Sequence, residues 1–332
     1  MDEKIKISVS KDTLEILKKD CIDFKICKEN GTPNQNAFIN TLVVNYYETF
    51  SASEESLHEE LRTALNAVPE YYREKAFANV VKVFAKPHED STFKKDTVTF
   101  SFKPTKNSQK AVLHIQRILL QNESLSSFYR RMFISYTQKT KNEREKIIHK
   151  ENYELLQKAI SRQTRVCLQL QSDHIIKDLS VYAVSSAKDE LYNYVLGHDG
   201  KHNQTIRLAS VKHVTLLPFT SFIPEEDVQL LQRQIACGAQ YPMYNTDNEP
   251  IRIQLTPQGK ELFGRIYLYR PTPESIDGDV YTFRCSAKQI LYYFERFGEH
   301  ALILSPKKLG IFMRNYYYFA LKKYKTLYKG NN

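Results

Sequence analysis

The sequence predicts a multidomain α+β fold. Three observations support this prediction: a strand-helix-helix pattern occurs twice in about the first 140 residues, a series of short strands follows, and strands then alternate with helices toward the C-terminus. The chain has 332 residues, of which 42% are hydrophobic. That length and composition allow two or three domains, each with its own core.

The first copy of the repeated pattern begins with an amphipathic strand. Apolar and polar residues alternate over residues 5–10, which is typical of a strand with one buried face. We expect Asp12 or Thr13 to cap the helix that follows, and Thr32-Pro33 to begin a second helix. The apolar stripe of that second helix contains Phe38, Ile39, Leu42, Val43 and Tyr46.

The second copy repeats this order near residue 97. Apolar and polar residues alternate over residues 97–103, a helix follows Pro104-Thr105, and a turn at residues 122–124 precedes another helix. The stripe of this last helix lies 90 positions after its counterpart in the first copy and contains Phe128, Tyr129, Met132, Phe133 and Tyr136.

This order of elements resembles the ribbon-helix-helix family, in which two strands pair as an antiparallel ribbon that enters the DNA major groove. Because a two-stranded ribbon is marginal without a partner, we expect an intramolecular pseudo-dimer. Its copies span residues 1–50 and 93–150, with a helical connector over residues 51–92. The outward-facing residues of the two strands would be Lys4, Lys6, Ser8, Ser10, Thr97, Thr99, Ser101 and Lys103.

Two interpretations of this outer face remain open: an ordinary solvated strand face or a nucleic-acid contact. The face offers cations and hydroxyls but no Asn or Gln for paired hydrogen bonds to bases. Phosphate contact is therefore better supported than base reading. The candidate residues here are Lys4, Lys6 and Ser8.

The middle of the chain contains short strands over residues 164–170, 179–184, 191–196 and 205–217, a spacing that predicts a small antiparallel barrel. Residues 193–199 (NYVLGHD) are similar to the Trp-Tyr-Leu-x-Gly-x-Asp signature of the WYL family, and residues 206–211 (IRLASV) resemble its Phe-Arg-Leu-Asp-Arg-Ile segment. The resemblance implies an Sm/SH3-like WYL β-barrel over residues 151–224. The sequence departs from the family pattern at Asn193, Ala209 and Ser210.

The WYL resemblance also implies a site. Family members use a polar pocket around the signature tyrosine and the first arginine to bind nucleic acid or nucleotide-like ligands, which points to Tyr194 and Arg207. The interleaved cations and tyrosines suit a single strand, because bases stack on rings while phosphates meet charge. Alternatively, Tyr192 or Tyr194 is a barrel core residue. The candidate residues are Tyr194, Arg207, Lys201, His202, Lys188, Tyr192, Ser210 and Lys212.

After residue 225 a helix leads into alternating strands and helices at 251–255, 257–262, 280–285, 287–297, 301–304 and 307–328. Residues 298–309 (GEHALILSPKKL) resemble the closing segment of the WYL C-terminal extension, which implies a ferredoxin-like, dimerising domain over residues 225–332. The last helix carries an aromatic stripe, which we interpret as a homodimer interface rather than a ligand site. The stripe contains Phe312, Tyr316, Phe319, Leu321 and Tyr324.

Charge and motif content narrow the function classes. The 48 basic residues exceed the 38 acidic ones by ten, which favours polyanionic partners. No apolar stretch is long enough for a membrane span or a signal core, so we expect a cytoplasmic protein with reduced thiols. The motifs GxxxxGK[ST], GxGxxG, HExxH and paired CxxC do not occur, so we expect no catalysis, cofactor or metal.

The succession of ribbon-helix-helix, WYL and extension resembles the accessory proteins of type VI-D CRISPR systems, which bind single-stranded RNA and enhance an RNA-guided RNA-cleaving effector. The resemblance implies a non-catalytic RNA-binding modulator of that effector in antiviral defence. The alternative is a ligand-responsive transcriptional repressor of a defence operon that binds duplex DNA through the ribbon. An RNA-degrading enzyme is disfavoured because no acid-base or metal constellation is present.

Overall fold

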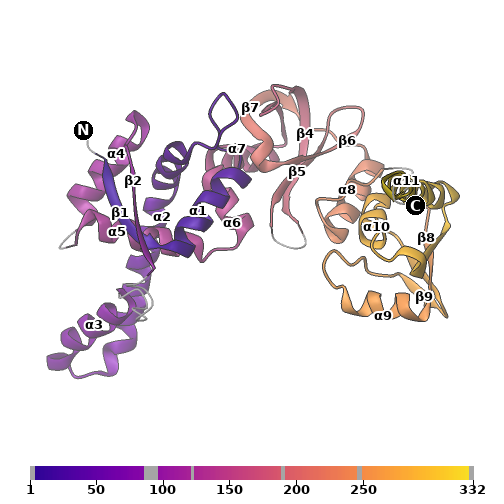
Figure 1. Ribbon diagram of the computed structural model, residues 1–332. Coiled ribbons are helices and arrows are strands. Elements are labelled where there is room, and N and C mark those ends of the chain that lie inside the picture. The colour runs from indigo at the N-terminus through magenta and orange to yellow at the C-terminus, as the bar shows by residue number, and fades with distance from the viewer. Residues whose placement is uncertain (1–3, 86–95, 121–122, 188–190, 245–248, 329–332) are drawn as a thin grey trace. The chain divides into compact units, whose positions relative to one another are not determined.

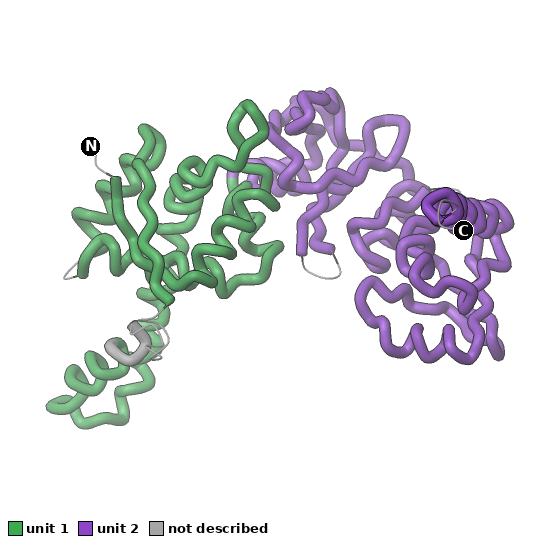
Figure 2. Tube along the Cα trace, in the orientation of Figure 1, with its two compact units in different colours: residues 1–150 green, residues 151–332 purple. Residues whose placement is uncertain are grey.

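The computed structural model describes residues 4–85, 96–120, 123–187, 191–244 and 249–328. The chain divides into two compact units, residues 1–150 and residues 151–332 (Figure 2). Each unit contains helices together with antiparallel strands, which confirms the predicted multidomain α+β class. Within the described ranges, no helix combines the length and apolar character needed to cross a membrane.

A two-stranded antiparallel ribbon in unit 1 pairs the first strands of the two copies of the repeat. Strand β1 (Ile5–Ser10) pairs with β2 (Thr97–Phe102), so that Ser8 lies opposite Thr99 (Figure 1). Ile7 and Val9 are fully buried, whereas the alternate residues face outward. The alternation of apolar and polar residues thus decides which face of the ribbon is covered.

The helices of unit 1 begin and end at positions that differ from the sequence prediction. Ser10 caps the first helix by accepting the backbone N–H of Thr13, and Asn34 caps the second by accepting that of Ala37, so the predicted caps at residues 12–13 and 32 are wrong. The second helix also continues through residues 50 and 51. The helices are α1 (Lys11–Asp23), α2 (Gln35–Ala64), α3 (Glu70–Ala85), α4 (Lys106–His114), α5 (Leu125–Thr137) and α6 (Lys141–Ile148), with short helical turns at Leu65–Ala67 and Ile115–Leu119.

The two copies of the repeat share one hydrophobic core. All ten residues of the two matched stripes are buried in it. The Tyr136 ring meets those of Phe38 and Tyr46 edge-on at 6.4 and 6.2 Å between centroids. Its hydroxyl donates to the buried Asp20 carboxylate at 3.0 Å, which also accepts from Arg144. Burial and the Asp20 charge raise the pKa of Tyr136 well above its ordinary value.

Helix α7 (Lys150–Ser161) starts at the last residue of unit 1, and it is followed in unit 2 by an antiparallel five-stranded sheet of order β6-β5-β4-β3-β7. The strand predicted over residues 205–217 is two strands, because the turn Leu208–Ser210 separates β6 from β7. Barrel closure stays a prediction, since β6 and β7 are the two ends of this hydrogen-bonded order. The strands are β3 (Thr164–Leu170), β4 (Ile175–Ser186), β5 (Asn193–His198), β6 (Asn203–Arg207) and β7 (Val211–Thr220).

A close approach between β4 and β5 requires glycine at position 197. A Cβ atom there would lie 2.5 Å from the Ser180 carbonyl oxygen, where β4 bulges between Val181 and Ala183. Helix α8 (Glu225–Cys237) contributes Leu231 to a small cluster with Leu196 of β5. The sheet therefore has a core of its own and a second apolar contact with α8.

The C-terminal part of unit 2 is a four-stranded antiparallel sheet of order β11-β8-β10-β9. Apolar residues on one face of the sheet pack against helices, whereas Arg252 and Gln254 of β8 are exposed on the other face. The strands are β8 (Ile251–Leu255), β9 (Ser275–Asp277), β10 (Val280–Phe283) and β11 (Ala301–Ser305), with helices α9 (Pro257–Arg265), α10 (Ala287–Phe294) and α11 (Lys307–Tyr328).

Helix α11 buries little of its length. Leu309 and Met313 join the core of the sheet. The predicted aromatic stripe is exposed instead, with fractions from 48% at Tyr316 to 62% at Tyr324. The stripe is thus not part of the core of unit 2, and its role as a homodimer interface stays a prediction.

The contact at Gly197 predicts a large difference between two glycine substitutions. Gly197→Ala should lower the free energy of unfolding by about 1–3 kcal/mol, because the added methyl group overlaps backbone that cannot move cheaply. Gly264→Ala is the control: position 264 lies in α9 with open space around the added Cβ, and alanine should stabilise the helix by up to about 1 kcal/mol. Urea unfolding measures both values, and equal effects would contradict the assignment.

Candidate nucleic-acid interface

An arginine and two tyrosines meet at the end of the β5-β6 strand pair. Tyr194 of β5 lies directly opposite Arg207 of β6. The Arg207 guanidinium carbon lies 3.6 Å from the centroid of the Tyr192 ring. This distance is short for a cation–π contact, and all three side chains are half-buried. We call these three residues the Tyr192–Arg207 cluster.

Local backbone pairing places the members of the cluster. The backbone N–H of Ala187 donates to the Tyr192 carbonyl at 2.8 Å, which sets Tyr192 just before β5. The tight turn between β5 and β6 fixes the register that puts Tyr194 opposite Arg207. Tyr194 also packs against the cluster of Leu196 and α8. Tyr194 is thus absent from the described core of the sheet, and the choice between a binding role and a core role for it stays a prediction.

Asp199 organises the turn between the two strands. One carboxylate oxygen accepts the backbone N–H groups of Lys201 and His202, both at 2.9 Å, and the other accepts the Gln204 side chain at 2.7 Å. Partial burial alone would raise the pKa of Asp199, but the hydrogen bonds from His202, Lys201 and Gln204 outweigh it and lower the pKa. Gly200 adopts a φ of 88°, in the left-handed region that favours glycine.

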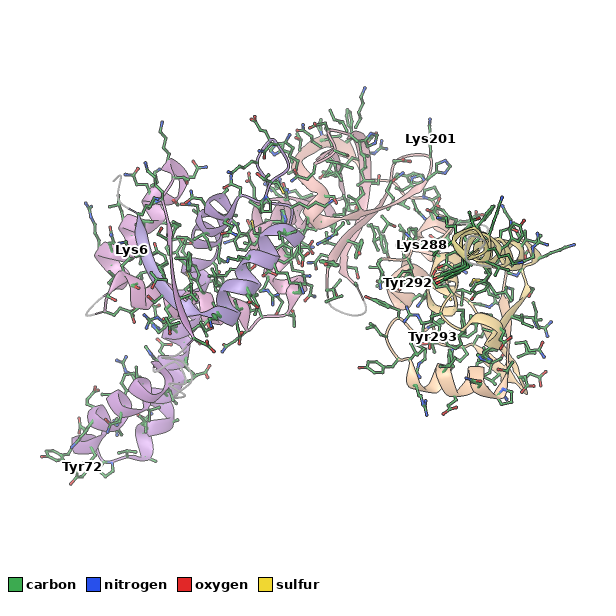
Figure 3. The ribbon with its side chains drawn as sticks, viewed as in Figure 1. Lys6, Tyr72, Lys201, Lys288, Tyr292 and Tyr293 are labelled. Atoms are coloured by element: carbon green, nitrogen blue, oxygen red, sulfur yellow. The ribbon has the colours of Figure 1, made fainter. Side chains whose placement is uncertain are left out.

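The side chain of Lys201 is exposed at the tip of this turn (Figure 3), and that of His202 is exposed next to it in the sequence. They lie at the opposite end of the strand pair from the Tyr192–Arg207 cluster. A strand of nucleic acid that contacts both must therefore follow the direction of β5 and β6. Among residues 193–199, Gly197 allows the close approach of β4 and Asp199 closes the turn into β6, whereas Tyr194 belongs to the Tyr192–Arg207 cluster.

The remaining sequence-predicted residues of this region lie elsewhere on the sheet. Ser210 lies in the turn after β6, and its carbonyl oxygen accepts the backbone N–H of Gln171 at 2.8 Å. Lys212 lies on β7 and pairs with Asp173 at 3.3 Å, with both side chains largely exposed. Lys188 falls outside the residues that the structure describes.

The outer face of the ribbon in unit 1 forms a second candidate surface. Lys6 is exposed (Figure 3), as is Lys4, and Ser8 is half-buried. The Ser8 hydroxyl hydrogen-bonds to the Thr99 hydroxyl across the strands at 2.8 Å. The Nε–H group of Arg130 in α5 donates a hydrogen bond to the Ser8 carbonyl at 2.7 Å, which links this helix to the ribbon. The structure thus presents the predicted cations and hydroxyls on one face.

The sequence analysis missed a cavity in the C-terminal part of unit 2. It has a volume of about 430 Å³ and is lined in part by Tyr241, Tyr267 and Gln289. Glutamines and tyrosines are common surface residues, and these positions come from separate elements. No pattern in the sequence marks them as neighbours.

Comparison with known proteins identifies a shared fold. No protein-family model and no curated protein matches the chain. The chain is similar to a solved structure described as a CRISPR Cas-related protein, with a TM-score of 0.69, 17% identity, and coverage of 98% of this chain and 95% of that chain. The proteasome accessory factor PafBC of Arthrobacter aurescens also matches, with 14% identity over 68% of this chain and 37% of that chain, but its TM-score is 0.25. The first likeness shows a common fold, and the second is too weak to show one.

The turn at Asp199 predicts a pH-dependent contribution to stability. Asp199→Ala should lower the free energy of unfolding at pH 7 by about 1 kcal/mol, because the carboxylate accepts several hydrogen bonds. Since the pKa of this carboxylate is lowered in the folded chain, the contribution is complete above the ordinary aspartate pKa and disappears as the pH falls through the lowered value.

Urea unfolding at pH 7 and at about pH 3 measures this change. Asp277→Ala, in the exposed strand β9, is the control and should show no comparable loss at either pH. A difference between the Asp199 variant and the native chain that stays constant with pH would contradict the role of the charged form.

Proposed function

We propose that the chain is a non-catalytic protein that binds single-stranded RNA. The observation that carries the proposal is the Arg207 guanidinium on the Tyr192 ring, beside Tyr194, on a strand pair that ends in Lys201 and His202. Rings accept unpaired bases by stacking, and cations neutralise the phosphates that connect them. An excess of ten positive charges over the whole chain supports a polyanionic partner.

The domain assignments belong to the same proposal. The β1-β2 pairing with two helices after each strand supports the ribbon-helix-helix assignment. The five-stranded sheet with Gly197 and Asp199 in architectural positions supports a WYL domain over residues 151–224. The β-α-β-β-α-β succession and the order β11-β8-β10-β9 support a ferredoxin-like extension over residues 225–332.

The proposed role is that of an accessory protein to an RNA-guided, RNA-cleaving CRISPR effector in the cytoplasm. Its support is the order of domains and the common fold with a protein described as CRISPR Cas-related. We further propose a homodimer. The exposed aromatic stripe of α11 supports it, because such a surface on a helix is ordinarily covered by a partner.

The outer face of the ribbon favours a second candidate function, a transcriptional repressor that binds duplex DNA. Exposed Lys4 and Lys6 lie beside hydroxyl-bearing residues on the same face. In ribbon-helix-helix proteins this face enters the major groove. In this alternative the WYL domain would sense a ligand and adjust DNA binding.

Removal of the central cation should weaken RNA binding. Arg207→Ala should lower the affinity for a labelled single-stranded RNA by about tenfold and reduce the slope of log affinity against log salt by about 1. Arg265→Ala, which removes an exposed arginine on α9, is the matched control and should change little. Fluorescence anisotropy over a salt series gives both quantities. If Arg207→Ala binds the RNA with unchanged affinity, the Tyr192–Arg207 cluster is not part of the RNA-binding surface.

A competition experiment separates the two candidate functions. At fixed salt, unlabelled single-stranded RNA should displace a bound labelled RNA at least about tenfold more effectively than duplex DNA of the same length. The double variant Lys4→Ala/Lys6→Ala should keep its affinity for RNA. If duplex DNA competes better and the double variant loses that preference, the repressor function is correct and the RNA proposal is wrong.

A further inference from the structure

The cavity of about 430 Å³ in unit 2 has the size of a small-molecule site. Three segments line it: the end of α8 with the chain that follows it, the loop over residues 267–272 between α9 and β9, and Gln289 of α10. It lies outside the sheet that carries the Tyr192–Arg207 cluster. Ligand contacts here would therefore be additional to those of the proposed RNA surface.

Two of the residues that line the cavity, Gln240 and Gln289, each have a buried amide oxygen with no hydrogen-bond donor among the described residues. Gln289 is 2% exposed. Its Nε2 donates to the Cys237 carbonyl at 3.4 Å, whereas its Oε1 accepts nothing. The Oε1 atom of Gln240 is also buried and accepts no hydrogen bond from the described residues. Buried acceptors are normally paired, so two unpaired oxygens in one cavity call for a ligand that brings two donors.

The mouth of the cavity offers a ring and a cation. Tyr267 is 78% exposed, so its ring is available to stack on a planar ligand. Arg270 also lines the cavity and uses one guanidinium N–H on the Phe263 carbonyl at 3.1 Å. The described lining residues include no aspartate or glutamate. This combination suits a planar ligand with an anionic group rather than a cation.

More rings and cations continue from this mouth onto α10. The Tyr269 ring meets the Tyr292 ring edge-on at 5.7 Å between centroids. Arg296 lies 6.0 Å from the Tyr292 ring, and Lys288 is exposed on the same helix one turn before Tyr292 (Figure 3). A phosphate chain that leaves the cavity in this direction would therefore meet Lys288 of α10 and Arg296, which follows that helix.

We propose that this cavity binds a guanine base, with Gln240 and Gln289 accepting its N1–H and its exocyclic amino group. Among the four RNA bases, guanine alone presents two adjacent nitrogen donors on its Watson–Crick edge. Tyr267 covers the base, and Arg270 contacts its phosphate. The base comes either from a free nucleotide or from an unpaired residue of RNA, and only the second source rests on the function proposed above.

Calorimetric titration of the full chain with GMP, AMP, CMP and UMP tests the proposal. GMP should bind saturably at one site per chain, about tenfold or more tighter than the other three nucleotides. Gln289→Leu and Gln240→Leu should each lower the affinity for GMP by about tenfold and reduce the preference for guanine. Because Gln289 also contacts Cys237, the half-buried Gln240 and the exposed Tyr267 provide variants with less effect on folding.

Tyr267→Ala should weaken the binding of GMP without changing the ranking of the bases. Gln258→Leu, on the exposed side of α9, is the matched control and should bind GMP as the native chain does. The proposal is wrong if GMP gives no saturable binding. It is also wrong if Gln240→Leu and Gln289→Leu both bind GMP with native affinity and preference.

Short RNAs then distinguish the two sources of the base. A pentanucleotide with one central guanosine should bind more tightly than oligouridine, and Gln289→Leu should abolish this difference, if the base belongs to RNA. GMP binding without such a gain assigns the cavity to a free nucleotide. Arg207→Ala should leave GMP binding unchanged in either case. A chain that binds GMP but no single-stranded RNA would refute the proposed function and leave this site intact.

Discussion

The antiparallel pairing of β5 with β6 is the constraint on which the proposed RNA surface depends. It sets Tyr194 opposite Arg207 and brings Arg207 over the Tyr192 ring. Two local features make the pairing possible. Gly197 allows β5 to approach the bulged β4, and the Asp199 carboxylate closes the turn into β6. The side chains proposed to contact RNA are thus positioned by residues that need not touch it.

The two units reach their folds in different ways. In the described part of unit 1, both copies of the repeat contribute matched residues to one core. The ribbon of unit 1 gains its stability from the helices beneath it, since two strands alone would be marginal. Unit 2 instead divides its apolar residues between two sheets, each with its own core. The C-terminal sheet leaves room for a cavity lined partly by loops, where polar atoms can be buried without partners.

Much of this architecture could be predicted because burial follows periodicity. Alternation over residues 5–10 correctly predicted the buried face of β1, and the stripes offset by 90 positions are all buried. The helix starts were predicted wrongly because Asp12 and Thr32 have side-chain oxygens that could cap a helix as well as those of Ser10 and Asn34, which accept the capping hydrogen bonds in the structure. The break after β6 was missed because Leu208 and Ala209 are apolar and resemble a continuing strand. The guanine cavity could not be predicted, since its amides meet only after α8 and α10 pack in the same unit.

The two strands of the ribbon belong to one polypeptide and differ in sequence. One strand has lysines at its start, whereas the outward positions of the other are mostly threonine and serine. A ribbon formed by two identical chains has two-fold symmetry and matches palindromic half-sites. This covalently joined ribbon has no such symmetry, so its two strands could diverge independently. Any polyanion that contacts it meets Lys4, Lys6 and Lys103 near one end of the ribbon and hydroxyl groups toward the other end, which gives the contact a direction.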